Sequence, residues 1–134
     1  MLRLGLLVAA LLLLAQPAAQ AQDRPQLADM AARQSLALYK SGGLSALINN
    51  SQDCHKYLLD KIYCIYLDTT AYQIDQSFVK TMGGPGHPYF DTEQTRERFR
   101  PILTSSGMSV QQANDFLRLS FSLVELASER NADG

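Results

Sequence analysis

The amino-acid sequence predicts an all-α protein, a compact bundle of four to five helices with one disulfide. Apolar residues recur at helical spacing along most of the chain, and no segment shows the clear alternation of a strand. The N-terminus has a short basic start, an apolar run over residues 4–14 and a small-x-small sequence at residues 19–21. These features are typical of a secretory signal peptide cleaved after Ala21, although a buried core helix is the competing interpretation of the apolar run. We expect residues 22–134 to form a single domain.

Cys54 and Cys64 are the only cysteines, and an even count in an exported protein predicts one disulfide. Ten residues of continuous helix rise about 15 Å, whereas bonded cysteines need Cα atoms within about 7 Å. The chain must therefore turn back between them. Closing so short a loop stabilises the fold by about 2–3 kcal/mol. Two free thiols, or pairing between subunits, are the alternatives.

The first helix is expected over residues 26–39, with Pro25 in its first turn and Gly42-Gly43 at its end. Its predicted inward side carries Leu27, Met30, Ala31, Gln34 and Leu38. Residues 44–48 favour a short helical turn, and residues 49–51 have the composition of a loop.

A second, long helix is expected over residues 60–82. Apolar or aromatic side chains occupy most of its circumference, which is typical of a helix at the centre of a domain or at a subunit contact. They are Ile62, Ile65, Tyr66, Tyr72, Ile74, Phe78 and Val79. Because β-branched residues lower helix propensity, a strand at residues 62–67 is the competing prediction.

Two further helices complete the predicted bundle. Asp91 or Thr92 caps a helix over residues 93–105, which Pro101 should kink or end. After Gly107, the sequence from Ser109 to Gln112 is a capping-box pattern that opens the last helix, which extends to Glu129. Its predicted core-facing stripe is Val110, Ala113, Leu117, Phe121 and Val124.

Composition and motifs argue against several classes of function. The formal net charge is −1 and no basic stripe is present, so we expect no nucleic-acid partner. After residue 21 no apolar run is long enough to cross a membrane. One possible set of metal ligands is Cys54, His55, Cys64 and His87, but the spacing of these residues matches none of the usual zinc patterns. We predict no metal, no cofactor and no catalytic residues, hence a protein that is not an enzyme.

Two groups of charged residues have alternative interpretations. Asp68 and Asp75 are seven residues apart and share one helix face, which makes them either an acidic contact strip or a solvent-facing or hydrogen-bonded structural pair. Arg96, Arg98 and Arg100 cluster at helical spacing with glutamates, which is typical of a solvated face and less often of a partner contact.

The loop over residues 83–90 is the best functional candidate. Its glycines allow close approach of the backbone to a partner, and its prolines limit the entropy lost on binding. It ends in two aromatic residues of the kind that anchor interfaces, unless they plug the core of an ordinary turn. The predicted partner-binding residues are Gly83, Gly84, Pro85, Gly86, His87, Pro88, Tyr89 and Phe90.

The central part of the chain resembles a known family. Leucines at 44 and 47 precede Cys54, and Tyr63-Cys64 opens a long helix that continues through Tyr66. This arrangement resembles the small exported immunity proteins that protect type VI secreting bacteria from peptidoglycan amidase effectors, the Tai/Rap-like family. Tyr66 comes one residue earlier than in the family pattern, and the glycine of that pattern is absent.

The resemblance implies an all-helical, disulfide-linked periplasmic protein that is often a homodimer and has no catalytic activity. It implies inhibition by binding a cognate secreted amidase and blocking its active-site cleft, commonly with a protruding loop. The disulfide would link Cys54 and Cys64. We assign residues 83–90 as the protruding loop from their composition. The alternative function is a periplasmic chaperone or envelope-stress binding protein. A small hydrolase is a third possibility, without a credible catalytic set.

Overall fold

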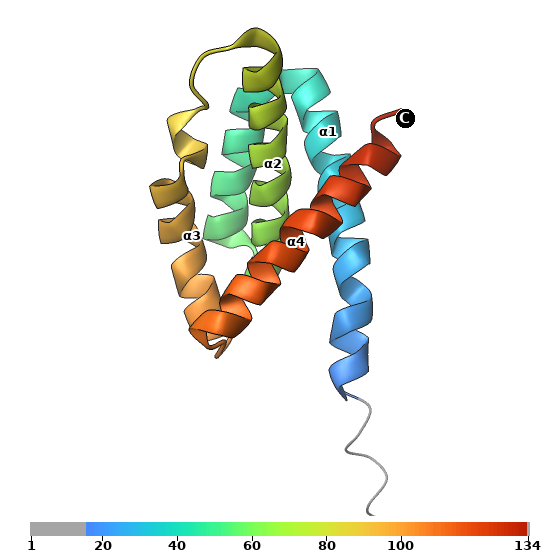
Figure 1. The fold of residues 1–134 in the computed structure, drawn as a ribbon, viewed down its shortest axis with the longest axis vertical. Coiled ribbons are helices and arrows are strands. Elements are labelled where there is room, and N and C mark those ends of the chain that lie inside the picture. Colours follow the sequence, from blue (N-terminus) through green and yellow to red (C-terminus); the bar gives the residue numbers. More distant parts are fainter. Residues whose placement is uncertain (1–15, 134) are drawn as a thin grey trace, which may run out of the picture.

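The computed structural model describes residues 16–133 and confirms the all-α prediction (Figure 1). This part of the chain contains helices and no strand, so the alternative of a strand at residues 62–67 is wrong. The elements, in order, are α1 (Gln16–Tyr57), α2 (Lys61–Met82), the short 3-10 helix η1 (Pro88–Phe90), α3 (Thr92–Ser105) and α4 (Val110–Asn131). Residues 1–15 of the predicted signal peptide lie outside the described residues.

α1 begins earlier than predicted, at Gln16, and Pro25 lies inside it rather than in its first turn. The inward side also differs from the prediction, because Met30 is 56% exposed and Gln34 is exposed. The prediction holds at Ala31, which is buried, and at Leu27 and Leu38, which pack against the core. Before residue 43, the residues that α1 buries fully are small, which lets neighbouring helices approach closely. Besides Ala31 they include Ala28, Ala32 and Ser35.

α1 is two helical stretches joined at a kink. Gly43 has φ 67° and ψ −156°, a backbone conformation that glycine adopts without steric cost. Residues 44–48 are helical as predicted, but the predicted loop at 49–51 is wrong, because the second stretch continues as far as Tyr57. Two of the polar residues that suggested a loop have partners on other turns of the bundle. Asn50 accepts a hydrogen bond from Gln34, and Ser51 donates one to Asp68.

α2 is central in the described bundle, as its apolar circumference predicted. Its predicted bounds are confirmed: Asp60 caps its first turn through Ile62 N, and Gly83 ends it with φ 79°. The two stretches of α1 lie on either side of α2, with α3 beyond the second stretch and α4 crossing the first (Figure 1). Cys64, Ile65 and Tyr66 near the start of α2 are completely buried, and the Tyr66 ring packs edge-on against Phe116 of α4.

The disulfide between Cys54 and Cys64 is present, with Cα atoms 5.6 Å apart. The chain turns back over residues 58–60, as the spacing of the cysteines required. Lys61 Nζ donates to the carbonyl oxygens of Cys54 and His55, which satisfies acceptors at the C-terminal end of α1. The crosslink thus joins the end of α1 to the first turn of α2.

α3 and α4 form a V that is closed at the turn between them (Figure 1). Asp91 caps α3, and Pro101 does not end it, since the helix continues to Ser105. The predicted capping box of Ser109 and Gln112 is present at the start of α4.

The predicted inward stripe of α4 holds at Val124, which is buried, and in part at Leu117, which packs against the core, but it is wrong at Val110 and Phe121. Val110 is 81% exposed and Phe121 is 42% exposed, while Leu117 and Ala113 are half-buried. The residues that α4 buries are Phe116, Ser120, Val124 and Ala127. α4 carries apolar residues on two faces, and the face that packs on α1 and α2 is the one that the periodicity did not select.

Candidate partner-binding site

The predicted loop follows α2 and lies at the opposite end of that helix from the disulfide (Figure 1). Gly83 and Gly84 have φ of 79° and 86°, values that side chains with a Cβ adopt at a cost. Two glycines at these angles let the chain leave α2 abruptly. The loop then returns to the bundle through η1, so both of its ends are attached to helices.

The first anchor of the loop is Asp75. Its carboxylate is 3% exposed, and Oδ2 accepts a hydrogen bond from the backbone N–H of His87 at 3.0 Å. Gly86 makes this contact possible, because a Cβ at that position would lie 2.8 Å from Asp75 Oδ2. The glycine therefore serves a close approach inside the protein.

The second anchor consists of the two aromatic residues. Phe90 is 3% exposed and packs in a small core cluster with Leu47 and Ala71. Tyr89 is half-buried, with its hydroxyl 2.7 Å from Ser51 Oγ and its ring 3.9 Å from the Arg98 guanidinium carbon. Burial raises the pKa of the Tyr89 hydroxyl.

The predicted site residues therefore divide into two groups. Tyr89 and Phe90 pack against the bundle, as the alternative interpretation of this loop described. The exposed members come before them in the chain, with Gly86 half-buried among them. We call residues 83–88 the loop tip; its exposed residues are Gly83, Gly84, Pro85, His87 and Pro88. The surface that a partner can reach on this loop is thus mostly glycine and proline.

A buried polar cluster supports the base of the loop. Asp68 is 1% exposed; its Oδ1 accepts from Ser51, and its Oδ2 accepts from Arg98 Nε at 2.8 Å. His55 Nε2 lies 3.0 Å from the same Oδ2. Arg98 also donates from Nη1 to the backbone oxygen of Tyr89 at 2.7 Å. The cluster connects α1, α2, η1 and α3 around one carboxylate.

The arrangement of this cluster differs from that of a serine nucleophile site. In a serine nucleophile site the imidazole lies between the hydroxyl and the carboxylate. Here Asp68 lies between Ser51 and His55, so no base is positioned on the hydroxyl. The prediction of an acidic contact strip is wrong, because Asp68 and Asp75 are both buried and hydrogen-bonded. The structural alternative for that pair is confirmed.

The other predicted groups are placed as follows. Arg98 turns inward to Asp68, with 13% of its side chain exposed, while Arg96 and Arg100 remain on the surface. The two cysteine sulfurs are bonded to each other, which removes them as thiolate ligands. No group of three His, Cys, Asp or Glu residues within the described chain is arranged to hold a metal ion.

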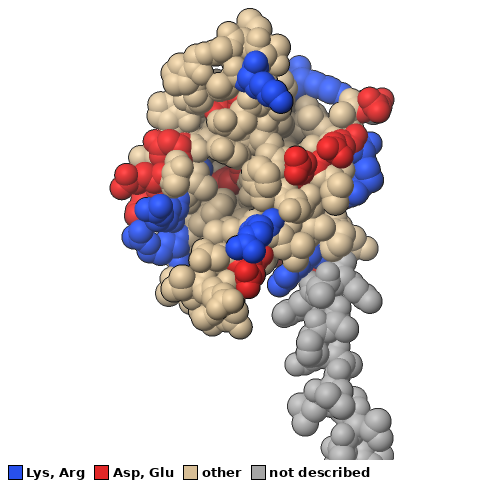
Figure 2. All heavy atoms as spheres, in the orientation of Figure 1, with Lys and Arg blue, Asp and Glu red and all other residues tan. Residues whose placement is uncertain are grey.

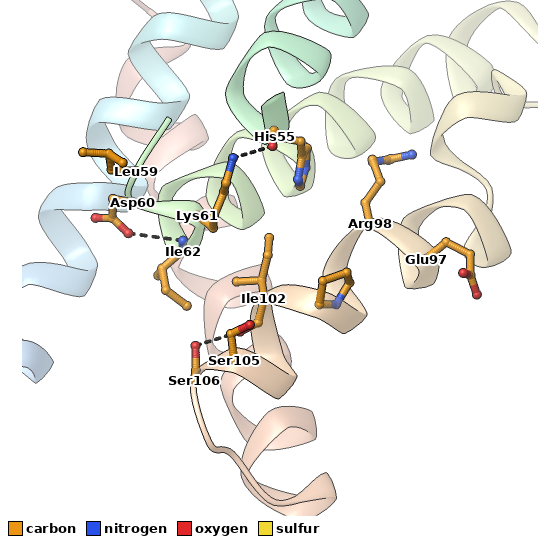
Figure 3. Close-up of a pocket in the computed structure, with 11 residues that line it drawn as sticks. His55, Leu59, Asp60, Lys61, Ile62, Glu97, Arg98, Ile102, Ser105 and Ser106 are labelled. Carbon is orange, nitrogen blue, oxygen red and sulfur yellow. Dashed lines mark hydrogen bonds between the residues drawn. The ribbon is translucent and has the colours of Figure 1, made fainter. Parts of the chain in front are cut away.

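A hollow of about 620 Å³ lies between the disulfide turn and α3, and no pattern of residues predicted it. Figure 3 shows His55, Lys61 and Arg98 around it, with Glu97 at its α3 side. Lys61, His55 and Arg98 are already hydrogen-bonded within the protein, so the hollow has no free cationic group directed into it.

The turn beside this hollow exposes three apolar residues in succession. Tyr57 is 69% exposed, Leu58 is 40% exposed and Leu59 is 99% exposed. Large apolar residues between two closely spaced cysteines could have signalled this surface, because a short closed loop cannot fold back to bury them.

Comparisons with protein-family models, with curated proteins and with solved structures find no match to this chain. Over residues 16–133, no helix has the length and apolar character needed to cross a membrane. A function for this site therefore has to be inferred from the geometry of the site alone.

Proposed function

We propose that this chain is an exported immunity protein, which binds a secreted peptidoglycan amidase in the periplasm and covers its active site. Inhibition would be steric, with no turnover and no cofactor. The observation that carries the proposal is the loop tip, an exposed glycine-proline segment that is fixed at its base by buried contacts.

Such a loop suits insertion into an enzyme cleft. Asp75 holds the backbone of His87, and Phe90 is buried in the bundle, so the segment between α2 and η1 has fixed ends. Little conformational freedom then remains to be lost on binding, which favours affinity. Glycine at positions 83 and 84 leaves the exposed backbone of the tip without side chains that would shield it, so a partner can approach it closely. These are the properties of a rigid inhibitory loop.

The first test is purification of the tagged, exported protein from the periplasm of its own cells, followed by mass spectrometry. We expect one stoichiometric partner with the sequence of a cysteine-peptidase-type amidase. Titration of that enzyme should then abolish its hydrolysis of peptidoglycan at one equivalent of inhibitor. A pure complex without loss of hydrolysis, or the absence of a dominant partner, would contradict the proposal.

The second test places the binding surface. Pro85→Arg puts a long charged side chain on the exposed tip, and Gln52→Arg puts the same side chain on exposed α1 as a control. We expect Pro85→Arg to weaken amidase binding at least tenfold and Gln52→Arg to leave it unchanged, with equal unfolding midpoints. Replacement of Phe90 would test packing instead, because that ring is buried. Equal affinity of both arginine variants would remove the tip from the interface.

A second candidate is a periplasmic chaperone, which the exposed apolar turn at residues 57–59 favours. A chaperone would bind many unfolded clients, and its captured proteins would increase under heat or acid. Leu59→Ser should then reduce capture of clients while leaving the loop tip intact. The immunity proposal requires the opposite result, a single folded partner whose binding is insensitive to heat stress.

A further inference from the structure

An open groove of about 670 Å³ runs between α3 and α4, with α2 at its floor. Figure 2 shows this face of the molecule hollowed between the two helices, with mostly uncharged atoms inside. The volume is in the range of sites that bury a ligand or a segment of a partner. Its apolar lining includes Tyr72, Phe90, Phe99, Val110, Leu117 and Phe121.

The wall of the groove formed by α4 is the stripe that its periodicity predicted to be buried. Val110 is 81% exposed, Phe121 is 42% exposed and Leu117 is half-buried between them. Phe121 continues the apolar surface onto α2, since its ring centroid lies 6.4 Å from that of Tyr72. These side chains are contiguous rather than scattered, which is the pattern of a binding surface.

The charge at the edge of the groove has one sign. Arg96 and Arg100 line the α3 side one helical turn apart, and Arg96 forms no ion pair within residues 16–133. Arg100 shares an exposed ion pair with Glu97, a contact of little energetic value that a partner can replace. The α4 side carries Ser109 and Asn114, which are uncharged. Asp68 lies at the inner end, but its Oδ1 already accepts from Ser51 and its Oδ2 is in contact with Arg98 and His55.

The length and shape of the groove suit a helix. At 1.5 Å per residue, α4 from Val110 to Phe121 is about 16 Å long, roughly three helical turns. α3 and α4 diverge from their common turn, and a helix between them would pack against both (Figure 1). A helix of that length presents three apolar residues at spacings of three and four to such a wall.

We propose that the groove docks an amphipathic helix of a partner protein, with apolar residues toward α4 and acidic residues toward Arg96 and Arg100. The proposal does not use the loop tip, so it can hold or fail independently of the inhibitory role proposed for that loop. The acidic flank follows from charge complementarity, because a basic segment would meet two arginines at close range. An uncharged apolar segment would leave Arg96 without a counter-charge beside a desolvated contact.

The experiment is selection of displayed peptides of about 14 residues, biased toward helix, on protein produced from the full-length chain and purified after export. We expect selected peptides to carry apolar residues at helical spacing and Asp or Glu along one flank. The best peptide is then labelled, and its affinity for protein variants is measured by fluorescence anisotropy.

Two exposed apolar residues of α4 give a matched pair of variants. Phe121 lines the groove and is 42% exposed, while Leu119 is 44% exposed and does not line it. We expect Phe121→Ser to weaken peptide binding at least tenfold, Arg96→Glu to do the same, and Leu119→Ser to leave it unchanged. Circular dichroism at 222 nm establishes that all three variants keep the helical content of the parent protein.

Four results would each overturn the proposal. In the first, the selection returns no binders, or binders without acidic enrichment. In the second, the Phe121→Ser variant binds the peptide as tightly as the Leu119→Ser variant. In the third, proline-containing extended peptides bind as well as helical ones, which is chaperone behaviour, and in the fourth, sedimentation shows a dimer that Phe121→Ser dissociates, which makes a second copy the occupant.

Discussion

Asp68 is the residue whose loss should be most informative about what holds this fold together. Its carboxylate is 1% exposed and is the common acceptor for Ser51 and Arg98, with His55 beside it. Asp68→Asn keeps the size of the side chain and removes its charge. The guanidinium of Arg98, which is 13% exposed, would then lie next to a neutral amide.

The loss of unfolding free energy expected for Asp68→Asn follows from the burial of Asp68 and Arg98. Removing one member of a buried ion pair costs about 3–5 kcal/mol, because the remaining charge has no counter-charge. Arg98 keeps its hydrogen bond to the backbone oxygen of Tyr89, which points to the lower end of that range. We expect a loss of about 3 kcal/mol from a total that is usually about 5–15 kcal/mol.

The assay is urea unfolding followed by circular dichroism at 222 nm. Glu97→Gln is the control, because it removes an ion pair to Arg100 in which both side chains are about 60% exposed; such pairs contribute about 0–1 kcal/mol. Asp68→Asn combined with Arg98→Met should cost less than the sum of the single variants, since it removes the uncompensated charge. The reasoning is refuted if Asp68→Asn costs no more than Glu97→Gln, or if the double variant is additive.

Two further predictions concern the loop and the tyrosines. Gly86→Ala should destabilise the protein by about 1–2 kcal/mol, because the new Cβ would be 2.8 Å from Asp75 Oδ2 and would lengthen the His87 amide hydrogen bond. Urea unfolding checks this, with Pro85→Ala as the control variant that should change stability little. Equal unfolding midpoints of the two variants would contradict the prediction. Burial raises the pKa of Tyr63, Tyr66 and Tyr89. The unfolded chain therefore loses these protons first, near pH 10, and stability should fall as the pH rises above about 10. Unfolding midpoints at pH 8 and 11 test this, and no decrease would be inconsistent with the burial of these hydroxyls.

Features with a local physical cause could be predicted from the sequence. The start of α2 at Asp60 and the capping box of Ser109 depend on side chains at the helix end, and the end of α2 at Gly83 depends on a backbone conformation that glycine permits. The disulfide followed from the number and spacing of the cysteines, and the turn between them followed from the length of a helix. These are the elements at which prediction and structure agree.

Features decided by distant residues could not be predicted in this way. Residues 49–51 have the composition of a loop, yet they are helical because Asn50 and Ser51 hydrogen-bond to Gln34 and Asp68. Arg98 turns inward between two arginines that do not, because only its position on α3 faces Asp68. No spacing rule within the arginine cluster distinguishes these three side chains.

The inward face of α4 was mispredicted for a related reason. Periodicity identifies an apolar face but does not say what packs against it. α4 has one apolar face on α1 and α2, through Phe116 and Val124, and another beside α3, through Leu117 and Phe121. The second face is open because α3 and α4 diverge (Figure 1). The stripe selected by periodicity thus became the wall of the groove.

The candidate loop and the groove share one residue, Phe90, which anchors η1 in the core and also lines the groove. A helix seated against Phe90 would contact the residue that anchors the inner end of the loop, so occupation of the groove should change binding at the tip through η1. The single variants separate these contributions. If Pro85→Arg affects only amidase binding and Phe121→Ser affects only the peptide, yet the peptide changes the affinity of the parent protein for the amidase, the two surfaces are distinct and coupled through η1. If either variant abolishes both activities, the loop and the groove form a single interface.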